Sequence, residues 1–201
     1  MKKIILASKS VDRSRLLKQA GITFKVVTSN IDEEKYKTTI TDPIELSKEL
    51  AKAKALSTKT ALIKDNLDYV IIAADTIVEL NGEIIGKAKN KVQAFKILKK
   101  LSGKTHNLIT GIAIIDTIIS KIIVDYDITS VEFLALSDKE IRGYINTNEW
   151  KGRAGAYSIE DKASLFINKI IGSSSNVMGL PMQKLYKILK KEFNVNLFQM
   201  D

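Results

Sequence analysis

The pattern of apolar and polar positions predicts a chain in which strands and helices alternate. Short β-branched runs predict strands, whereas apolar residues repeated every three or four positions predict helices. The expected strands are Lys3–Ala7, Ile22–Thr28, Tyr69–Leu80, Glu83–Gly86, His106–Asp116, Ile118–Phe133 and Leu165–Ile171. The expected helices are Val11–Ala20, Asp42–Leu62, Lys91–Leu101, Asp138–Asn146 and Pro181–Phe193.

Hairpin signals occur among these elements. Asn81-Gly82 separates two apolar runs and is a strong two-residue turn. Because hairpins are mixed with alternating helices and strands, the pattern predicts an α/β fold with a mixed, partly antiparallel twisted sheet flanked by helices. No linker rich in Pro, Gly or Ser divides the chain, so residues 1–201 are expected to form a single domain.

One carboxylate, Asp75, interrupts the longest apolar run of the chain, residues 69–80. The run is continuous rather than alternating, which is typical of a strand that is buried on both faces. An ionised carboxylate in such a strand needs a metal, a cation or hydrogen-bond donors to meet it. Asp75 is therefore the first candidate for a catalytic residue.

Composition narrows the chemistry. The chain has no cysteine and one histidine, His106, which excludes disulfides, thiolate metal sites and a two-histidine zinc site. A metal would be bound mainly by oxygen, which favours Mg²⁺ or Mn²⁺. No apolar run is long enough for a signal peptide or a membrane span, so we expect a cytoplasmic protein without a membrane partner.

A net charge of +9 favours anionic partners, either nucleic acid or phosphorylated small molecules. The basic cluster in the last helix has little aromatic interleaving, so it is interpreted as a solvated helix face and nucleic acid is not expected as a partner.

Further candidates are each open to two interpretations. Residues 7–13, Ala-Ser-Lys-Ser-Val-Asp-Arg, lie at a strand-to-helix junction and form either a phosphate cradle or an ordinary helix cap with Arg13 facing outward. Lys54 lies on the apolar stripe of its helix and either reaches the edge of the core or enters an anion site.

Residues 30–34 form an acidic turn that is either solvated or a source of metal ligands. Residues 152–160 form either a turn into a strand or a loop whose Tyr157 and Glu160 contact a base.

The order of these stretches resembles the Maf family of nucleoside triphosphate pyrophosphatases. The resemblance rests on residues 6–13 with Leu16-Leu17, on residues 50–55, and on residues 74–78 through Gly86-Lys87. Residues 101–106, Thr110-Gly111, 154–157 and 176–181 also match, so the likeness spans nearly the whole chain.

The resemblance implies a bilobed Maf/ITPase-like fold that binds a nucleoside triphosphate in a central cleft and releases a monophosphate and pyrophosphate. It implies a divalent cation held by Asp75 and Glu33, with Asp75 also activating water. Ser8, Arg13, Lys54 and Lys87 are expected to bind the triphosphate. A homodimer and a role in nucleotide house-cleaning or cell-division arrest would also be typical of the family.

Three positions are expected to set base specificity. Thr76 matches the branch that acts on dTTP and UTP, whereas Glu160 resembles the branch that acts on 7-methyl-GTP, and Asp12 replaces an arginine of the pyrimidine-specific members. Glutamate only accepts hydrogen bonds, whereas glutamine both donates and accepts them. We therefore expect action on dTTP, UTP or modified pyrimidine nucleotides. The alternatives are 7-methyl-GTP or other modified purines, and a basic nucleic-acid-binding regulator of cell division with little catalysis.

Overall fold

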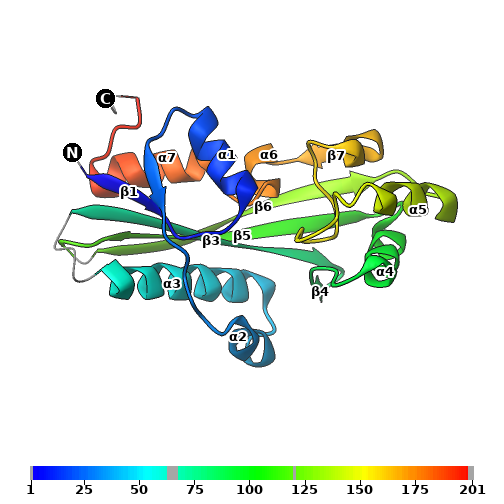
Figure 1. Ribbon diagram of the computed structural model, residues 1–201, viewed down its shortest axis with the longest axis horizontal. Coiled ribbons are helices and arrows are strands. Elements are labelled where there is room, and N and C mark those ends of the chain that lie inside the picture. Colours follow the sequence, from blue (N-terminus) through cyan, green and yellow to red (C-terminus); the bar gives the residue numbers. More distant parts are fainter. Residues whose placement is uncertain (1, 63–67, 120, 199–201) are drawn as a thin grey trace. The chain divides into compact units, whose positions relative to one another are not determined.

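A computed structural model describes residues 2–62, 68–119 and 121–198, and shows strands and helices in alternation (Figure 1). The strands are β1 (Lys3–Leu6), β2 (Phe24–Val26), β3 (Tyr69–Leu80), β4 (Glu83–Ile85), β5 (Thr105–Asp116), β6 (Ile122–Phe133) and β7 (Ile167–Ile171). The helices are α1 (Val11–Gln19), α2 (Glu33–Thr39), α3 (Pro43–Leu62), α4 (Lys91–Leu101), α5 (Asp138–Asn146), η2 (Lys162–Leu165), α6 (Ser174–Val177) and α7 (Met182–Phe193).

The strands form one seven-stranded sheet in the order β2-β1-β3-β5-β6-β7, with β4 paired to β3. β1 runs parallel to β2 and to β3, whereas β4 is antiparallel to β3 and β7 is antiparallel to β6. The mixed α/β class predicted from the sequence is thereby confirmed. Among the described residues, no helix is long and apolar enough to cross a membrane.

The chain divides into two compact units, to which β3, β5 and β6 each contribute. Unit 1 comprises residues 1–75, 110–127 and 179–201, and unit 2 comprises residues 76–109 and 128–178. The single domain and the central cleft expected from the sequence stay predictions.

In unit 1 successive side chains of each strand point to opposite faces of the sheet, so the strands contribute to two separate hydrophobic clusters. Ile4 and Leu6 pack with α1 and α7 on one face, whereas Ile5 packs with α3 on the other. Figure 1 shows α1 and α7 on one side of these strands and α3 on the other. On β3, residues 69, 71 and 73 belong to the α3 face. Since side chains on a strand alternate, Asp75 continues that series and lies on the face that α3 covers.

Close packing of α3 against the sheet depends on a glycine. A Cβ atom built on Gly111 of β5 would lie 2.2 Å from the carbonyl oxygen of Ser47 on α3. Only a residue without a side chain lets the two backbones approach so closely. Gly111 therefore fixes the position of the helix that carries Lys54.

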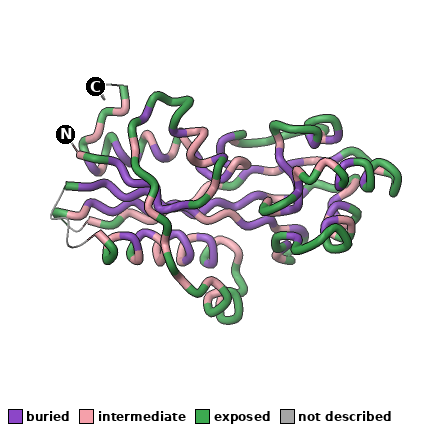
Figure 2. Tube along the Cα trace, in the orientation of Figure 1, coloured by how far each residue is buried: buried purple, intermediate pink, exposed green. Residues whose placement is uncertain are grey.

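In unit 2 one hydrophobic cluster joins the strands to α4 and α5, and Figure 2 shows buried positions along its strands. Its centre is aromatic: the rings of Phe133 and Tyr157 meet edge to face at 4.8 Å between centroids, as do those of Phe133 and His106. Tyr157 is only 4% exposed, which supports a role in the core and not the interpretation of Tyr157 as a base contact. Its hydroxyl lies 2.9 Å from His106 Nε2 instead.

Most predicted elements are confirmed within one or two residues. The hairpin at Asn81-Gly82 has positive φ angles at both positions (51° and 83°), as a type I′ turn requires. The strand predicted over residues 22–28 is reduced to Phe24–Val26, and the strand predicted from residue 118 begins at Ile122. The predicted acidic turn is wrong in part, because Asp32 caps a helix, α2, that begins at Glu33.

Candidate active site

A lysine on α3 joins two carboxylates from different elements. Lys54 Nζ lies 2.5 Å from Asp75 Oδ1 on β3 and 2.7 Å from Glu33 Oε1 at the first position of α2. The Lys54 and Asp75 side chains are 12% and 14% exposed, so these charges interact in a medium that is partly shielded from water. We call Glu33, Lys54 and Asp75 the carboxylate–lysine cluster. Lys54 therefore enters a polar site rather than extending to the edge of the core.

The serine–arginine loop, residues 8–13, adds a second cation. Arg13 Nε donates a hydrogen bond to the Gly179 carbonyl (2.7 Å), and its Nη1 donates to Ser8 Oγ (3.1 Å). Burial lowers the pKa of Arg13, and the charges of Asp75 and Glu33 oppose that shift. Arg13 is thus directed into the protein, and the outward orientation that helix periodicity predicts is wrong.

The helix cap predicted at Ser10 is present in the same loop. Its hydroxyl accepts the Arg13 N–H at 3.4 Å, and the Ser10 N–H donates to Ser8 Oγ at 3.2 Å. The backbone amides at the start of α1 and the guanidinium of Arg13 therefore converge near Ser8, which is 7% exposed. Convergent N–H donors and a cation are the groups that bind phosphate oxygens.

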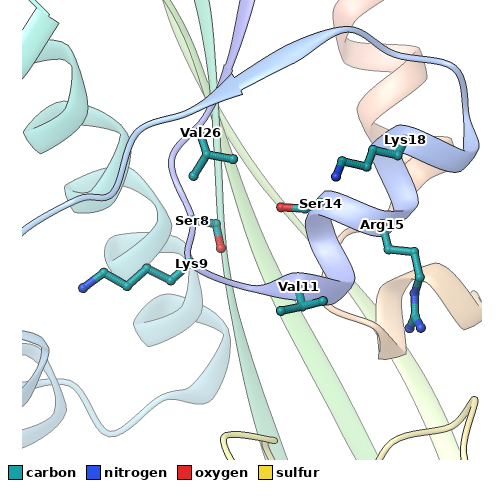
Figure 3. A pocket seen from close by; sticks show the side chains of 7 residues that line it. All are labelled: Ser8, Lys9, Val11, Ser14, Arg15, Lys18 and Val26. Atoms are coloured by element: carbon teal, nitrogen blue, oxygen red, sulfur yellow. The ribbon is translucent and has the colours of Figure 1, made fainter.

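A hollow of about 430 Å³ adjoins this loop (Figure 3). Ser8 contributes to its wall, and the remaining lining comes from the loop before α1, from α1 and from β2: Lys9, Val11, Ser14, Arg15, Lys18 and Val26. Three of these side chains are cationic, so the environment of the loop favours anions. Asp12 does not add a free carboxylate, because Arg15 Nη2 lies 3.1 Å from its Oδ1.

Lys37 is a residue that the sequence analysis missed. It lies on α2, with Nζ 2.7 Å from Glu34 Oε1 and 3.6 Å from Glu33 Oε2. Partial burial lowers the pKa of Lys37, but the hydrogen bond that Lys37 donates to Glu34 and the charges of Glu33, Glu34 and Asp75 outweigh it and raise the pKa overall. The sequence did contain a signal for this pair, because Glu33 precedes Lys37 by four residues, a spacing that favours an ion pair on a helix.

The other predicted residues lie in unit 2. Thr76 follows Asp75 on β3 and is partly buried. Lys87 and Glu160 are exposed, and the Lys87 backbone pairs with Ala154 in an isolated antiparallel bridge. Two sequence stretches that carried the family resemblance are therefore adjacent within this unit.

Glu33 and Asp75 meet part of the requirement for a divalent cation. The described residues contain no group of three or more His, Cys, Asp or Glu side chains that could hold a metal. Two carboxylates that face one ammonium group provide hard oxygen donors, and Mg²⁺ typically takes one or two of these together with water and substrate phosphates. The pair fits a metal that substrate helps to bind, and not a site made by protein alone.

An α/β sheet with paired carboxylates, a lysine and a serine–arginine loop is typical of the class of proteins that bind phosphorylated anions. The model of the Maf-like protein family matches residues 3–192. The chain therefore belongs to the Maf family.

Relatives of known name cover almost the whole chain. A dTTP/UTP pyrophosphatase of Alkaliphilus oremlandii is 49% identical over 197 residues, which is 98% of this chain and 100% of the relative. Proteins of the same name from Caldicellulosiruptor saccharolyticus and Clostridium tetani are 44% and 43% identical, and each comparison covers at least 95% of both chains. A solved nucleoside-triphosphatase / dITP/XTP pyrophosphatase of Mycobacterium abscessus shares 13% identity at a TM-score of 0.36, over 65% of this chain and 72% of that one.

Proposed function

We propose that the chain is a metal-dependent nucleoside triphosphate pyrophosphatase that acts on dTTP and UTP. The observation that carries the proposal is the carboxylate–lysine cluster, in which Lys54 bridges Asp75 and Glu33 beside Arg13. Membership of the Maf family and relatives named dTTP/UTP pyrophosphatase support both the reaction and the substrates.

The cations of the site would bind the triphosphate. Arg13 and Lys54 carry positive charge, Ser8 and the amides at the start of α1 donate hydrogen bonds, and Lys87 is expected to add a further cation. Phosphoryl transfer depends mainly on charge stabilisation and on the orientation of the attacking group. These residues would spread the negative charge that develops on the phosphate oxygens and hold the chain of phosphates in one orientation.

Asp75 would orient and deprotonate water. The water oxygen forms a bond to the α-phosphorus, and the bond from this phosphorus to the α–β bridging oxygen breaks. The bond electrons leave with pyrophosphate, and the water proton passes to Asp75. Glu33 and Asp75 would bind Mg²⁺ or Mn²⁺, which supplies charge neutralisation when bound.

The choice of base involves Asp12, Thr76 and Glu160. The names of the relatives favour pyrimidines, as Thr76 does, whereas Glu160 favours the alternative substrate, 7-methyl-GTP. The family resemblance assigns recognition of the base to position 160. Exchange of Glu160 for glutamine restores a hydrogen-bond donor there. A shift of the UTP to 7-methyl-GTP activity ratio in Glu160→Gln would support this role, and an unchanged ratio would remove it.

The test uses purified protein with a panel of nucleoside triphosphates, Mn²⁺ and ¹⁸O-labelled water. We expect pyrophosphate release, with dTTP and UTP preferred, and the label in the monophosphate because water attacks the α-phosphorus. Label in pyrophosphate, or no pyrophosphate from any nucleotide, would contradict the proposal. DNA binding with steep salt dependence and no hydrolysis would instead favour the nucleic-acid-binding regulator.

The cytoplasmic location, the homodimer and the single domain belong to the same proposal. The location is supported by a sequence that contains no cysteine, since a reducing compartment does not use disulfides. Light scattering after gel filtration measures the mass in solution and distinguishes a dimer from the 22.4 kDa monomer.

A further inference from the structure

Glu33 lies between two lysines. Its Oε1 is 2.7 Å from Lys54 Nζ, and its Oε2 is 3.6 Å from Lys37 Nζ. Lys37 is itself held at 2.7 Å by Glu34 Oε1. Each oxygen of the Glu33 carboxylate therefore faces a different ammonium group, one from α3 and one from α2.

The sequence of α2 favours this arrangement. Asp32 accepts the Glu34 N–H and begins the helix, so Glu33 and Lys37 are separated by one full turn. An acid that precedes a lysine by four residues is the favourable order for such a pair. The helix thus places Lys37 near the Glu33 oxygen that does not face Lys54.

A bound substrate would affect the Glu33–Lys54 contact and the Glu33–Lys37 contact differently. Lys54 is one of the residues expected to bind phosphates, and a triphosphate carries more negative charge than Glu33. When Lys54 turns toward phosphate, Glu33 loses that one contact while the charge of Arg13 still acts on it, and its side chain is 39% exposed. A carboxylate as open as this samples several rotamers unless a second contact holds it.

We propose that Lys37 is a positioning residue that keeps Glu33 directed toward Asp75 when nucleotide draws Lys54 away. The proposal rests on the proposed function, because it concerns the metal-binding orientation of Glu33. Lys37 does not touch substrate in this account, and it acts only through the Glu33 carboxylate. Residues that orient metal ligands commonly change metal affinity by 10-fold or more. The Lys37 side chain is 43% exposed, so a smaller effect of about 3- to 10-fold is expected.

The test measures Mn²⁺ binding by electron paramagnetic resonance, in the presence of an α,β-methylene analogue of UTP that is not hydrolysed. The variants are Lys37→Gln, Lys37→Arg and, as control, Lys35→Gln, which removes the same charge from an exposed position of the same helix. We expect Lys37→Gln to raise the Kd for Mn²⁺ about 3- to 10-fold, Lys37→Arg to stay within about twofold of the parent protein, and Lys35→Gln to change nothing. With UTP, Lys37→Gln should raise the KM for Mn²⁺ and leave kcat at saturating Mn²⁺ unchanged.

Three results would overturn the inference alone: equal Mn²⁺ affinity in the two glutamine variants, a lower Tm for Lys37→Gln without a change in Mn²⁺ affinity, or a raised KM for UTP at saturating Mn²⁺. The last would mean that Lys37 contacts phosphate directly. The proposed function is tested separately by the parent protein. If the parent protein neither binds Mn²⁺ with the analogue nor releases pyrophosphate from any nucleotide, both proposals fail.

Discussion

The two units treat their buried polar groups in opposite ways. In unit 1 several of these groups, buried or partly buried, are ionised and paired: Lys54 bridges Asp75 and Glu33, and the fully buried Asp116 accepts hydrogen bonds from Lys2 and from the N–H groups of Ile118 and Ile119. In unit 2 the central polar groups are neutral, with His106 and Tyr157 hydrogen-bonded among aromatic rings.

This difference follows from the cost of burial. Desolvation penalises a charge unless a partner offsets it, so a buried histidine surrounded by rings stays neutral, and its pKa falls to about 4. Unit 1 instead maintains charges in a partly open cluster, where a ligand can exchange partners with them. The comparison places the carboxylate–lysine cluster in unit 1 and a packed aromatic core in unit 2.

Among the variants that break the comparison between the two units, the largest effect after that of Asp75 is expected from Lys54→Met. This substitution removes the Lys54 ammonium, which is the cation that Asp75 and Glu33 share. It also removes a group that would bind phosphate. We expect kcat/KM for UTP to fall about 100- to 1000-fold, measured by pyrophosphate release. Lys52→Met is the control, because Lys52 on the same helix pairs only at the surface with Glu49 at 3.4 Å among the contacts described here. Equal losses in both variants would remove the special role of the cluster.

A second prediction concerns the packing that places Lys54. Gly111→Ala would bring a Cβ atom against the Ser47 backbone, so α3 or β5 must shift. We expect a loss of about 2–3 kcal/mol in the free energy of unfolding, or about 6–10 °C in Tm by calorimetry. Gly86→Ala, where nothing lies within 4 Å of the added Cβ, should leave Tm within about 2 °C. A fall in Tm for Gly86→Ala alone would contradict the packing account.

The third prediction is the smallest and tests the neutral core of unit 2. The pKa of His106 is about 4 in the folded protein and about 6.5 when unfolded, so the unfolded chain binds more protons between these values. The stability that His106 contributes is complete above pH 6.5 and is lost as the pH falls toward 4. Between pH 7 and 4.5 the free energy of unfolding of the parent protein should fall by about 2 kcal/mol more than that of His106→Asn, measured by urea unfolding. Parallel losses in the two proteins would show that His106 does not resist protonation.

Local sequence signals predicted much of this architecture because the forces that set it are local. The turn at Asn81-Gly82 and the apolar run of β3 each depend on neighbouring residues, and each is present in the structure. Helix α2 was missed because Glu33–Thr39 has no apolar stripe, and its start depends on one hydrogen bond that the Asp32 side chain accepts from the Glu34 N–H.

The sequence named candidate residues for the site but did not indicate their contacts. Helix periodicity places Arg13 outward, but its partner Gly179 is 166 positions away in the sequence, where no local pattern can indicate it. Lys37 was missed together with its helix. Asp75 was found because a carboxylate in an apolar strand is conspicuous, yet nothing in the sequence showed that Lys54 and Glu33 meet it.

The most direct test of the central claim compares two aspartates of unit 1 under the same exchange. Asp75→Asn removes the charge from the carboxylate–lysine cluster, and Asp125→Asn removes it from the pair that Asp125 forms with Lys184 at 3.0 Å. Pyrophosphate release from UTP is measured with Mn²⁺ at saturation, together with Tm. We predict at least about a 1000-fold loss for Asp75→Asn and none for Asp125→Asn, with both Tm values within a few degrees of the parent protein. Equal activity in the two variants would contradict the assignment of catalysis to Asp75.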